Sequence, residues 1–144
     1  MKMLRRMLLL VIAVSLAACQ AAATSQPAVE VVGQKVSVEG GSYTDVSVAE
    51  MQTMLADKDF TFVNVHIPFE GDIAGTDLSI PYDQIDQNLG ELPADKDAKI
   101  VLYCRSGRMT AIAAQTLINL GYTNIWNLSG GMVAWERAGL PIER

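Results

Sequence analysis

The segment around Cys104 constrains the fold of this chain more than any other. An apolar run, Lys99 to Tyr103, ends at Cys104, and a polar turn of residues 105–109 follows. A helical pattern over residues 110–120 begins directly after that turn. This order of strand, tight turn and helix places the thiol where backbone N–H groups converge and the helix dipole favours negative charge. Such a setting lowers the pKa of a cysteine and produces a reactive thiolate.

Short apolar segments alternate with helical segments along the rest of the chain. Strands are expected at 43–46, 60–65 and 125–128, and helices after the capping box at 47–50, at 82–89 and at 132–138. This alternation predicts an α/β fold, a parallel sheet with helices on both faces. In such sheets, sites form beyond the carboxyl ends of the strands, which is where Cys104 and His66 lie.

The first eighteen residues stand apart from this pattern. Residues 1–6 carry positive charge, and the apolar stretch 7–18 is shorter than the roughly 20 residues of a membrane-spanning helix, which is typical of a secretory signal peptide. Residues 16–19 resemble the lipobox of bacterial lipoproteins, which implies cleavage before Cys19 and lipidation of that residue. The alternative is an ordinary signal peptide that happens to contain a cysteine.

We therefore predict three regions: a lipoprotein signal peptide at 1–18, a tether at 19–40 and a folded domain at 41–144. Several acyl chains on Cys19 would hold the protein stably on a membrane. The expected location is the cell envelope, lipid-anchored and facing outside the cytoplasm, on the periplasmic side or at the cell surface.

The charge balance narrows the set of partners. Loss of residues 1–18 leaves 8 basic against 16 acidic residues, a net charge of −8, which argues against nucleic acid or an anionic bilayer surface as a partner. Against this acidic background, Arg105 and Arg108 form a cationic island beside Cys104 that suits a small anion. With Cys19 lipidated, Cys104 has no disulfide partner within the chain.

The order and spacing of several motifs resemble the rhodanese family over roughly Tyr43 to Ile142. Three segments carry this resemblance: Phe62–His66 followed by Glu70 and Ile73–Thr76; Val101–Thr110; and Leu128–Trp135 followed by Ala138–Pro141. The resemblance implies a rhodanese-like α/β domain and a sulfurtransferase. In such enzymes the cysteine takes a sulfane sulfur from a small anionic donor such as thiosulfate and becomes a persulfide. The sulfur then passes to a thiophilic acceptor.

The resemblance also implies roles for individual residues. Cys104 would be the catalytic nucleophile. The loop after it would bind the substrate through Arg105, Ser106, Gly107, Arg108 and Met109. No cofactor is expected, and no metal site, because one histidine and one free thiol are too few for the usual ligand sets.

Two positions depart from the family pattern, because Asn64 and His66 stand where Asp and Arg are usual. His66 is the only histidine, so it is a candidate for tuning the site as a titratable group. A blander interpretation is a polar residue at a strand end. In the same way, Cys104 alone could be a small buried residue, and its two arginines could be solvated charges.

Two other functions compete with sulfur transfer. The altered positions 64 and 66 favour a non-catalytic rhodanese-like module that carries sulfur or binds a partner. A cysteine-dependent phosphatase or arsenate reductase would use a related loop. Such phosphatases need an arginine six positions after the cysteine, and Thr110 occupies that position, so the sequence argues against this chemistry.

Overall fold

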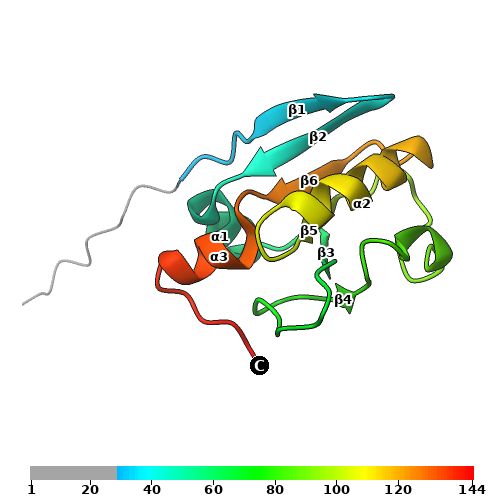
Figure 1. The fold of residues 1–144 in the computed structure, drawn as a ribbon. Helices are drawn as coiled ribbons and strands as arrows, with labels where there is room; N and C mark the ends of the chain where they lie inside the picture. The colour runs from blue at the N-terminus through cyan, green and yellow to red at the C-terminus, as the bar shows by residue number, and fades with distance from the viewer. Residues whose placement is uncertain (1–28) are drawn as a thin grey trace, which may run out of the picture.

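The computed structural model describes residues 29–144, so the predicted signal peptide and Cys19 lie outside the described residues. A six-stranded sheet forms the centre of this part of the chain (Figure 1). Its strands are β1 (Gln34–Val38), β2 (Gly41–Val46), β3 (Thr61–Asn64), β4 (Leu78–Ser79), β5 (Ile100–Tyr103) and β6 (Ile125–Leu128). The helices are α1 (Val48–Ala56), α2 (Arg108–Asn119) and α3 (Gly131–Arg137), with a short 3-10 helix η1 (Ile85–Gln87). Within residues 29–144, no helix has the length and apolar character needed to span a membrane.

The strand order is β1-β2-β6-β5-β3-β4, and all neighbours are parallel except the β1–β2 hairpin. The predicted α/β fold with a mostly parallel sheet is therefore confirmed. β3 and β5 are adjacent, with Asn64 opposite Tyr103 at their carboxyl ends. This register places the chain segments that follow the two strands at the same edge of the sheet.

The hairpin corrects the predicted boundary between tether and domain. Residues 34–40 belong to the fold, because β1 pairs along its length with β2 and Val36 lies opposite Tyr43. Val38 packs against the hydrophobic core, so the alternating pattern of this segment is that of an edge strand. The boundary predicted at residue 40 is therefore wrong, and the sheet begins at Gln34.

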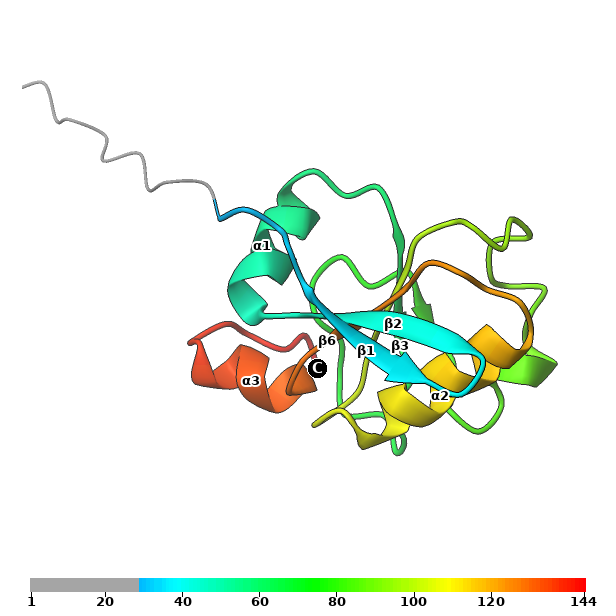
Figure 2. The ribbon, with the colours of Figure 1, turned by 90° about the horizontal axis from the view of Figure 1, so that it is seen from above.

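Two hydrophobic clusters cover the two faces of the sheet, and β5 contributes alternate residues to each. Ile100 and Leu102 pack on the face covered by α2 and η1, whereas Val101 and Tyr103 pack on the face covered by α1 and α3. The view from above separates α1 and α3 from α2 in the same way (Figure 2). All four β5 residues are fully buried, as expected for a central strand of a parallel sheet.

Two helices differ in extent from the sequence pattern. α2 begins at Arg108 rather than at 110, because Gly107 adopts a left-handed conformation with φ of 114° and turns the chain directly into the helix. The segment 82–89 forms only the single turn η1. Ile85 is its one fully buried side chain, and a single apolar contact does not stabilise a longer helix.

Candidate active site

A cavity of about 200 Å³ opens at the carboxyl edge of the sheet. Cys104 follows β5 directly and His66 lies two residues beyond β3, so adjacent parallel strands deliver both side chains to this cavity. Its lining residues are His66, Tyr82, Cys104, Arg105, Ser106, Arg108, Met109 and Ile112. Four of the five predicted substrate-binding residues thus lie in the cavity wall, and the fifth, Gly107, contacts the sulfur.

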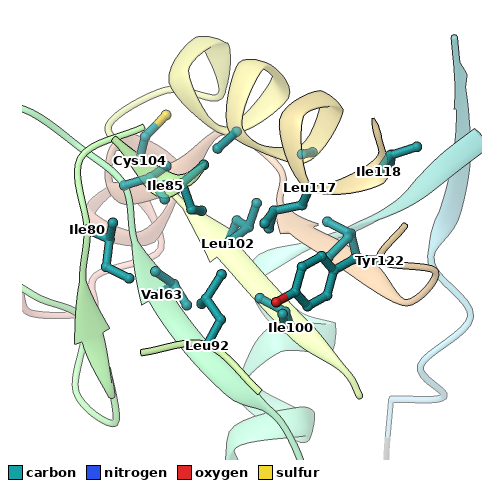
Figure 3. Packing of buried hydrophobic residues seen from close by; sticks show 14 residues of the cluster. Val63, Ile80, Ile85, Leu92, Ile100, Leu102, Cys104, Leu117, Ile118 and Tyr122 are labelled. Carbon is teal, nitrogen blue, oxygen red and sulfur yellow. The ribbon is translucent and has the colours of Figure 1, made fainter. Parts of the chain in front are cut away.

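The sulfur of Cys104 accepts two hydrogen bonds. The backbone N–H of Gly107 donates to Sγ at 3.0 Å, and the Thr110 hydroxyl donates at 3.1 Å. Figure 3 shows Cys104 at one end of the buried cluster, beside the start of α2. The thiol is 2% exposed and Thr110 is fully buried, so water competes little for these bonds. The sequence marked Thr110 only as a missing arginine, and its contact with the sulfur is new information from the structure.

These contacts set the charge state of Cys104. Burial alone raises the pKa of the thiol, because it disfavours the thiolate. The hydrogen bonds from the Thr110 side chain and backbone, and from the backbone of Gly107 and Ser106, act in the opposite direction and outweigh it. The pKa of Cys104 therefore lies below its ordinary value, as the position at a helix N-terminus predicts.

The start of α3 holds the Cys104 loop, residues 104–109, through two backbone hydrogen bonds, which we call the backbone clamp. The Met132 N–H donates to the Cys104 carbonyl at 2.9 Å, and the Val133 N–H donates to the Arg105 carbonyl at 3.0 Å. This approach requires glycine at position 131, because a Cβ there would lie 2.1 Å from the Cys104 oxygen. The sequence pattern predicts the helix that begins here but gives no sign of its contact with the loop.

The two arginines of the loop have different surroundings. Arg105 donates from Nη1 to Glu70 Oε2 at 2.5 Å. The hydrogen bond from Arg105 holds the pKa of Glu70 below its usual value. Arg108 has no ion-pair partner among residues 29–144 and lines the cavity, so its charge is available to an anion there.

The β3–β4 loop, residues 65–77, is fixed by a buried polar network. The Asn64 side-chain amide donates to the Gly71 carbonyl at 3.0 Å and to Asp72 Oδ1 at 2.9 Å. Its own oxygen accepts the His66 backbone N–H at 2.9 Å, and the Tyr103 hydroxyl donates to Asp72 Oδ1 at 3.0 Å. An aspartate at position 64 could not donate to Asp72, so the asparagine suits its neighbour.

His66 lies at the base of this loop and is buried. Its Nε2 lies 3.2 Å from Glu70 Oε2, but the contact lacks hydrogen-bond geometry. Neither ring nitrogen has a hydrogen-bond partner within the described residues. No group of three or more His, Cys, Asp or Glu side chains in this part of the chain could hold a metal ion.

Known proteins resemble this chain in sequence and in fold. Residues 47–138 match the family model of the rhodanese-like domain. A protein named sulfurtransferase from Allochromatium vinosum is 36% identical over 102 residues, which cover 68% of this chain and 92% of that protein. A tRNA uridine(34) hydroxylase from Erwinia tasmaniensis is 32% identical over 71% of this chain, but the match covers only 31% of the hydroxylase. The crystal structure of a rhodanese-related protein from Thermoplasma volcanium superposes with a TM-score of 0.57, at 29% identity over 68% of this chain and 95% of that one.

Proposed function

The chain belongs to the family of rhodanese-like domains, and from this premise we propose that it is a sulfurtransferase whose Cys104 carries the transferred sulfur as a persulfide. The observation that supports this most is the environment of the Cys104 sulfur. Two donated hydrogen bonds favour its thiolate form, in a cavity that also contains the Arg108 guanidinium, which has no ion-pair partner among residues 29–144. A nucleophilic sulfur beside a site for an anion is what attack on a small sulfur oxyanion requires.

The first half-reaction loads the cysteine. The Cys104 thiolate attacks the sulfane sulfur of thiosulfate, a new S–S bond forms, and the S–S bond of the donor breaks with its electron pair leaving on sulfite. Arg108 lies where it can hold the sulfonate, and guanidinium geometry suits oxyanions. The backbone N–H groups of the Cys104 loop stabilise the charge on the sulfur as it moves outward.

The second half-reaction returns the thiolate. A thiophilic acceptor attacks the outer sulfur of the persulfide, and the electron pair of the broken S–S bond returns to Cys104. The same hydrogen bonds from Gly107 and Thr110 stabilise this leaving thiolate. No cofactor is needed, because the sulfane sulfur keeps its oxidation level throughout.

A turnover assay tests this proposal. Wild-type protein given thiosulfate and cyanide is expected to form thiocyanate, and Cys104→Ser is expected to lose all enzymatic turnover because serine cannot form a persulfide. Thr53→Ala, a change at a half-buried position of α1 that does not line the cavity, provides the control and should keep wild-type turnover. Equal turnover by wild-type protein and Cys104→Ser would contradict the proposal.

A second candidate function is a sulfur-carrying or partner-binding module with little turnover of its own. The replaced positions 64 and 66, with the unpartnered ring of His66, favour it. It predicts that Cys104 loads with sulfur but discharges to no small acceptor. Phosphatase chemistry is disfavoured, because Thr110 donates to the sulfur at the position where a phosphate-clamping arginine is needed.

We further propose that the protein is lipid-anchored through Cys19 at the cell envelope, outside the cytoplasm. The support is the sequence of residues 1–19 alone. Expression in a bacterium with a radiolabelled fatty acid is expected to label the wild-type protein, and Cys19→Ser should remove both the label and the recovery in the membrane fraction. An unlabelled wild-type protein released to the soluble fraction would contradict the anchor.

A further inference from the structure

We propose that His66 is the proton-transferring catalytic residue of this cavity and directs it toward organic thiol acceptors, an inference that rests on the proposed sulfurtransferase function. Of the side chains that line the cavity, His66 is the only one, apart from the thiol, of a type that exchanges a proton near neutral pH. Acceptors such as thiols must lose a proton before they attack, whereas sulfite reacts without losing one.

The state of the His66 ring supports a role in substrate binding. The side chain is 7% exposed, and neither ring nitrogen has a hydrogen-bond partner within residues 29–144. A buried polar atom without a partner costs free energy, so native proteins retain few of them and these often serve a function. Both nitrogens are buried in this structure. A ring that turns toward an acceptor seated beside Cys104 would gain from its S–H group the partner that it lacks.

Glu70 and Arg105 place a fixed negative charge beside the His66 ring. Glu70 Oε2 lies 3.2 Å from His66 Nε2, and its charge favours the tautomer with the proton on Nε2, although the contact lacks hydrogen-bond geometry. The lone pair then lies on Nδ1, which becomes the acceptor. Arg105 fixes the carboxylate through its bond of 2.5 Å to the same oxygen. The other charged or titratable groups around the cavity are Cys104, Arg108 and Tyr82.

The cavity wall indicates the class of acceptor. Tyr82, Met109 and Ile112 contribute apolar surface to the cavity wall, and Ile112 is 42% exposed. An inorganic anion gains nothing from these side chains, whereas the carbon chain of an organic thiol would bury apolar surface against them. A thiol with a short apolar arm therefore matches both the base and the wall.

The transfer step balances without an oxidant or a cofactor. The acceptor S–H gives its proton to His66 Nδ1, and its sulfur attacks the outer sulfur of the Cys104 persulfide. An S–S bond to the acceptor forms, the S–S bond at Cys104 breaks, and the electron pair remains on Cys104 as the thiolate. The acceptor leaves as a persulfide, and the imidazolium returns its proton to water.

Single-turnover discharge tests this role. Cys104 is loaded with thiosulfate, the donor is removed, and the protein is mixed with an alkanethiol, with an aromatic thiol already ionised at neutral pH, or with sulfite at mildly alkaline pH. His66→Gln is expected to slow discharge to the alkanethiol about 100-fold, the usual contribution of a general base. Discharge to the ionised aromatic thiol and to sulfite should keep the wild-type rate.

A rescue experiment separates proton transfer from structure. Added imidazole should restore alkanethiol discharge in His66→Ala, where it can occupy the vacated space, and should leave His66→Gln unchanged. If neither variant folds, a solvent isotope effect on the wild-type protein still tests the role of His66. Solvent deuterium should slow its discharge to the alkanethiol and leave discharge to the ionised aromatic thiol unaffected.

The outcomes distinguish this inference from the proposed function. If wild-type Cys104 never gains sulfur, the sulfurtransferase proposal fails. If it loads normally and His66→Gln discharges to the alkanethiol at the wild-type rate, or slows equally with all three acceptors, only the role of His66 is overturned. Equal solvent isotope effects for the two thiols would also overturn it.

Discussion

The Cys104 loop, residues 104–109, is held mainly by backbone groups, whereas the β3–β4 loop, residues 65–77, adds a side-chain network to its backbone hydrogen bonds with Tyr103 and Glu143. Backbone N–H groups of α3 bind the carbonyls of Cys104 and Arg105. On the neighbouring strand, the side chains of Asn64, Asp72 and Tyr103 fix the loop that carries His66 and Glu70. The two loops meet at one cavity. One part of its wall binds the sulfur through backbone groups, and the other part depends on side chains that a substitution can change.

This contrast suggests which parts of the site depend on side-chain identity. Backbone hydrogen bonds tolerate many side chains but require glycine where chains approach closely, as at Gly131. A side-chain network instead requires matched donors and acceptors, and Asn64 beside Asp72 is one such pair. We therefore expect sulfur binding to depend on the first loop, and acceptor choice and local stability to depend on the second. Four substitutions test this division.

Gly131→Ala should have the largest effect on stability, because it disrupts the hydrogen bonds from the start of α3 to the Cys104 and Arg105 carbonyls. The added Cβ meets the Cys104 carbonyl, and the positive φ of 54° adds strain. Unfolding free energy should fall by about 2 kcal/mol or more, from a left-handed backbone and an overpacked contact together. Denaturant titration measures this loss, and sulfur loading of Cys104 should slow as well.

The matched control is Gly139→Ala at the other end of α3. Gly139 also has a positive φ, of 79°, but nothing lies within 4 Å of its added Cβ. It should cost about 1 kcal/mol and leave loading unchanged. If both variants lost the same stability and both kept normal loading, the clamp would have no importance for the Cys104 loop.

Thr110→Val should come next, because it removes one hydrogen bond from the sulfur and keeps the shape of the side chain. A hydrogen bond to a charged group contributes about 1.5–3 kcal/mol, so its loss makes the thiolate less favourable relative to the thiol. The bond lowers the pKa of Cys104 in the wild type, so its loss raises that pKa. At neutral pH less thiolate remains, and alkylation by iodoacetamide should slow roughly 10- to 100-fold.

The pH profile of alkylation checks the sign of this effect. The rates of wild type and Thr110→Val should converge at alkaline pH, where both thiols are ionised. Thr110→Ser, which keeps the hydroxyl, should follow the wild-type profile. If Thr110→Val were alkylated at the wild-type rate at neutral pH, the Thr110 hydroxyl would not lower the pKa of Cys104.

Asn64→Asp tests the β3–β4 loop. The new carboxylate would lie beside Asp72 Oδ1, where the amide now donates at 2.9 Å, and it also loses the donation to Gly71. Stability should fall by about 1–3 kcal/mol at neutral pH. Repulsion raises the folded-state pKa of the carboxyl pair, so the penalty is present above that pKa and is relieved as pH falls through it.

The double variant Asn64→Asp with Asp72→Asn is the control for that penalty. It restores one amide and one carboxylate in exchanged places and should recover part of the lost stability, measured by thermal unfolding at neutral and acidic pH. A single variant as stable as the wild type at both pH values would show that the network does not fix the loop.

Glu70→Gln should have the smallest effect on stability. The ion pair between Glu70 and Arg105 lies at the surface, with both side chains more than a third exposed, and such pairs contribute little. The denaturation midpoint should stay at the wild-type value in low and in high salt. A clear, salt-sensitive loss would mean that the surface pair, and not the buried network, holds the β3–β4 loop.

The same contrast explains how much the sequence predicted. The Cys104 loop could be predicted because its parts are consecutive: an apolar strand, a cysteine, a glycine-containing turn and a helix. The place of His66 at the same edge of the sheet as Cys104 followed from the general rule for parallel sheets, whereas the strand order came only from the structure. The β3–β4 network could not be predicted, because Asn64, Asp72 and Tyr103 meet only after β3 and β5 pair. The hairpin strand β1 was missed because its alternation is short and its side chains are mostly exposed.

The most direct test of the central claim is the intact mass of the protein after incubation with thiosulfate or an organic persulfide. We expect wild-type protein to gain the mass of one sulfur atom, to lose it on addition of a reducing thiol, and to keep Cys104 protected from alkylation while loaded. Cys104→Ser should gain nothing. No added sulfur on the wild-type protein with any donor, or the same gain in Cys104→Ser, would contradict the assignment of Cys104 as the sulfur carrier.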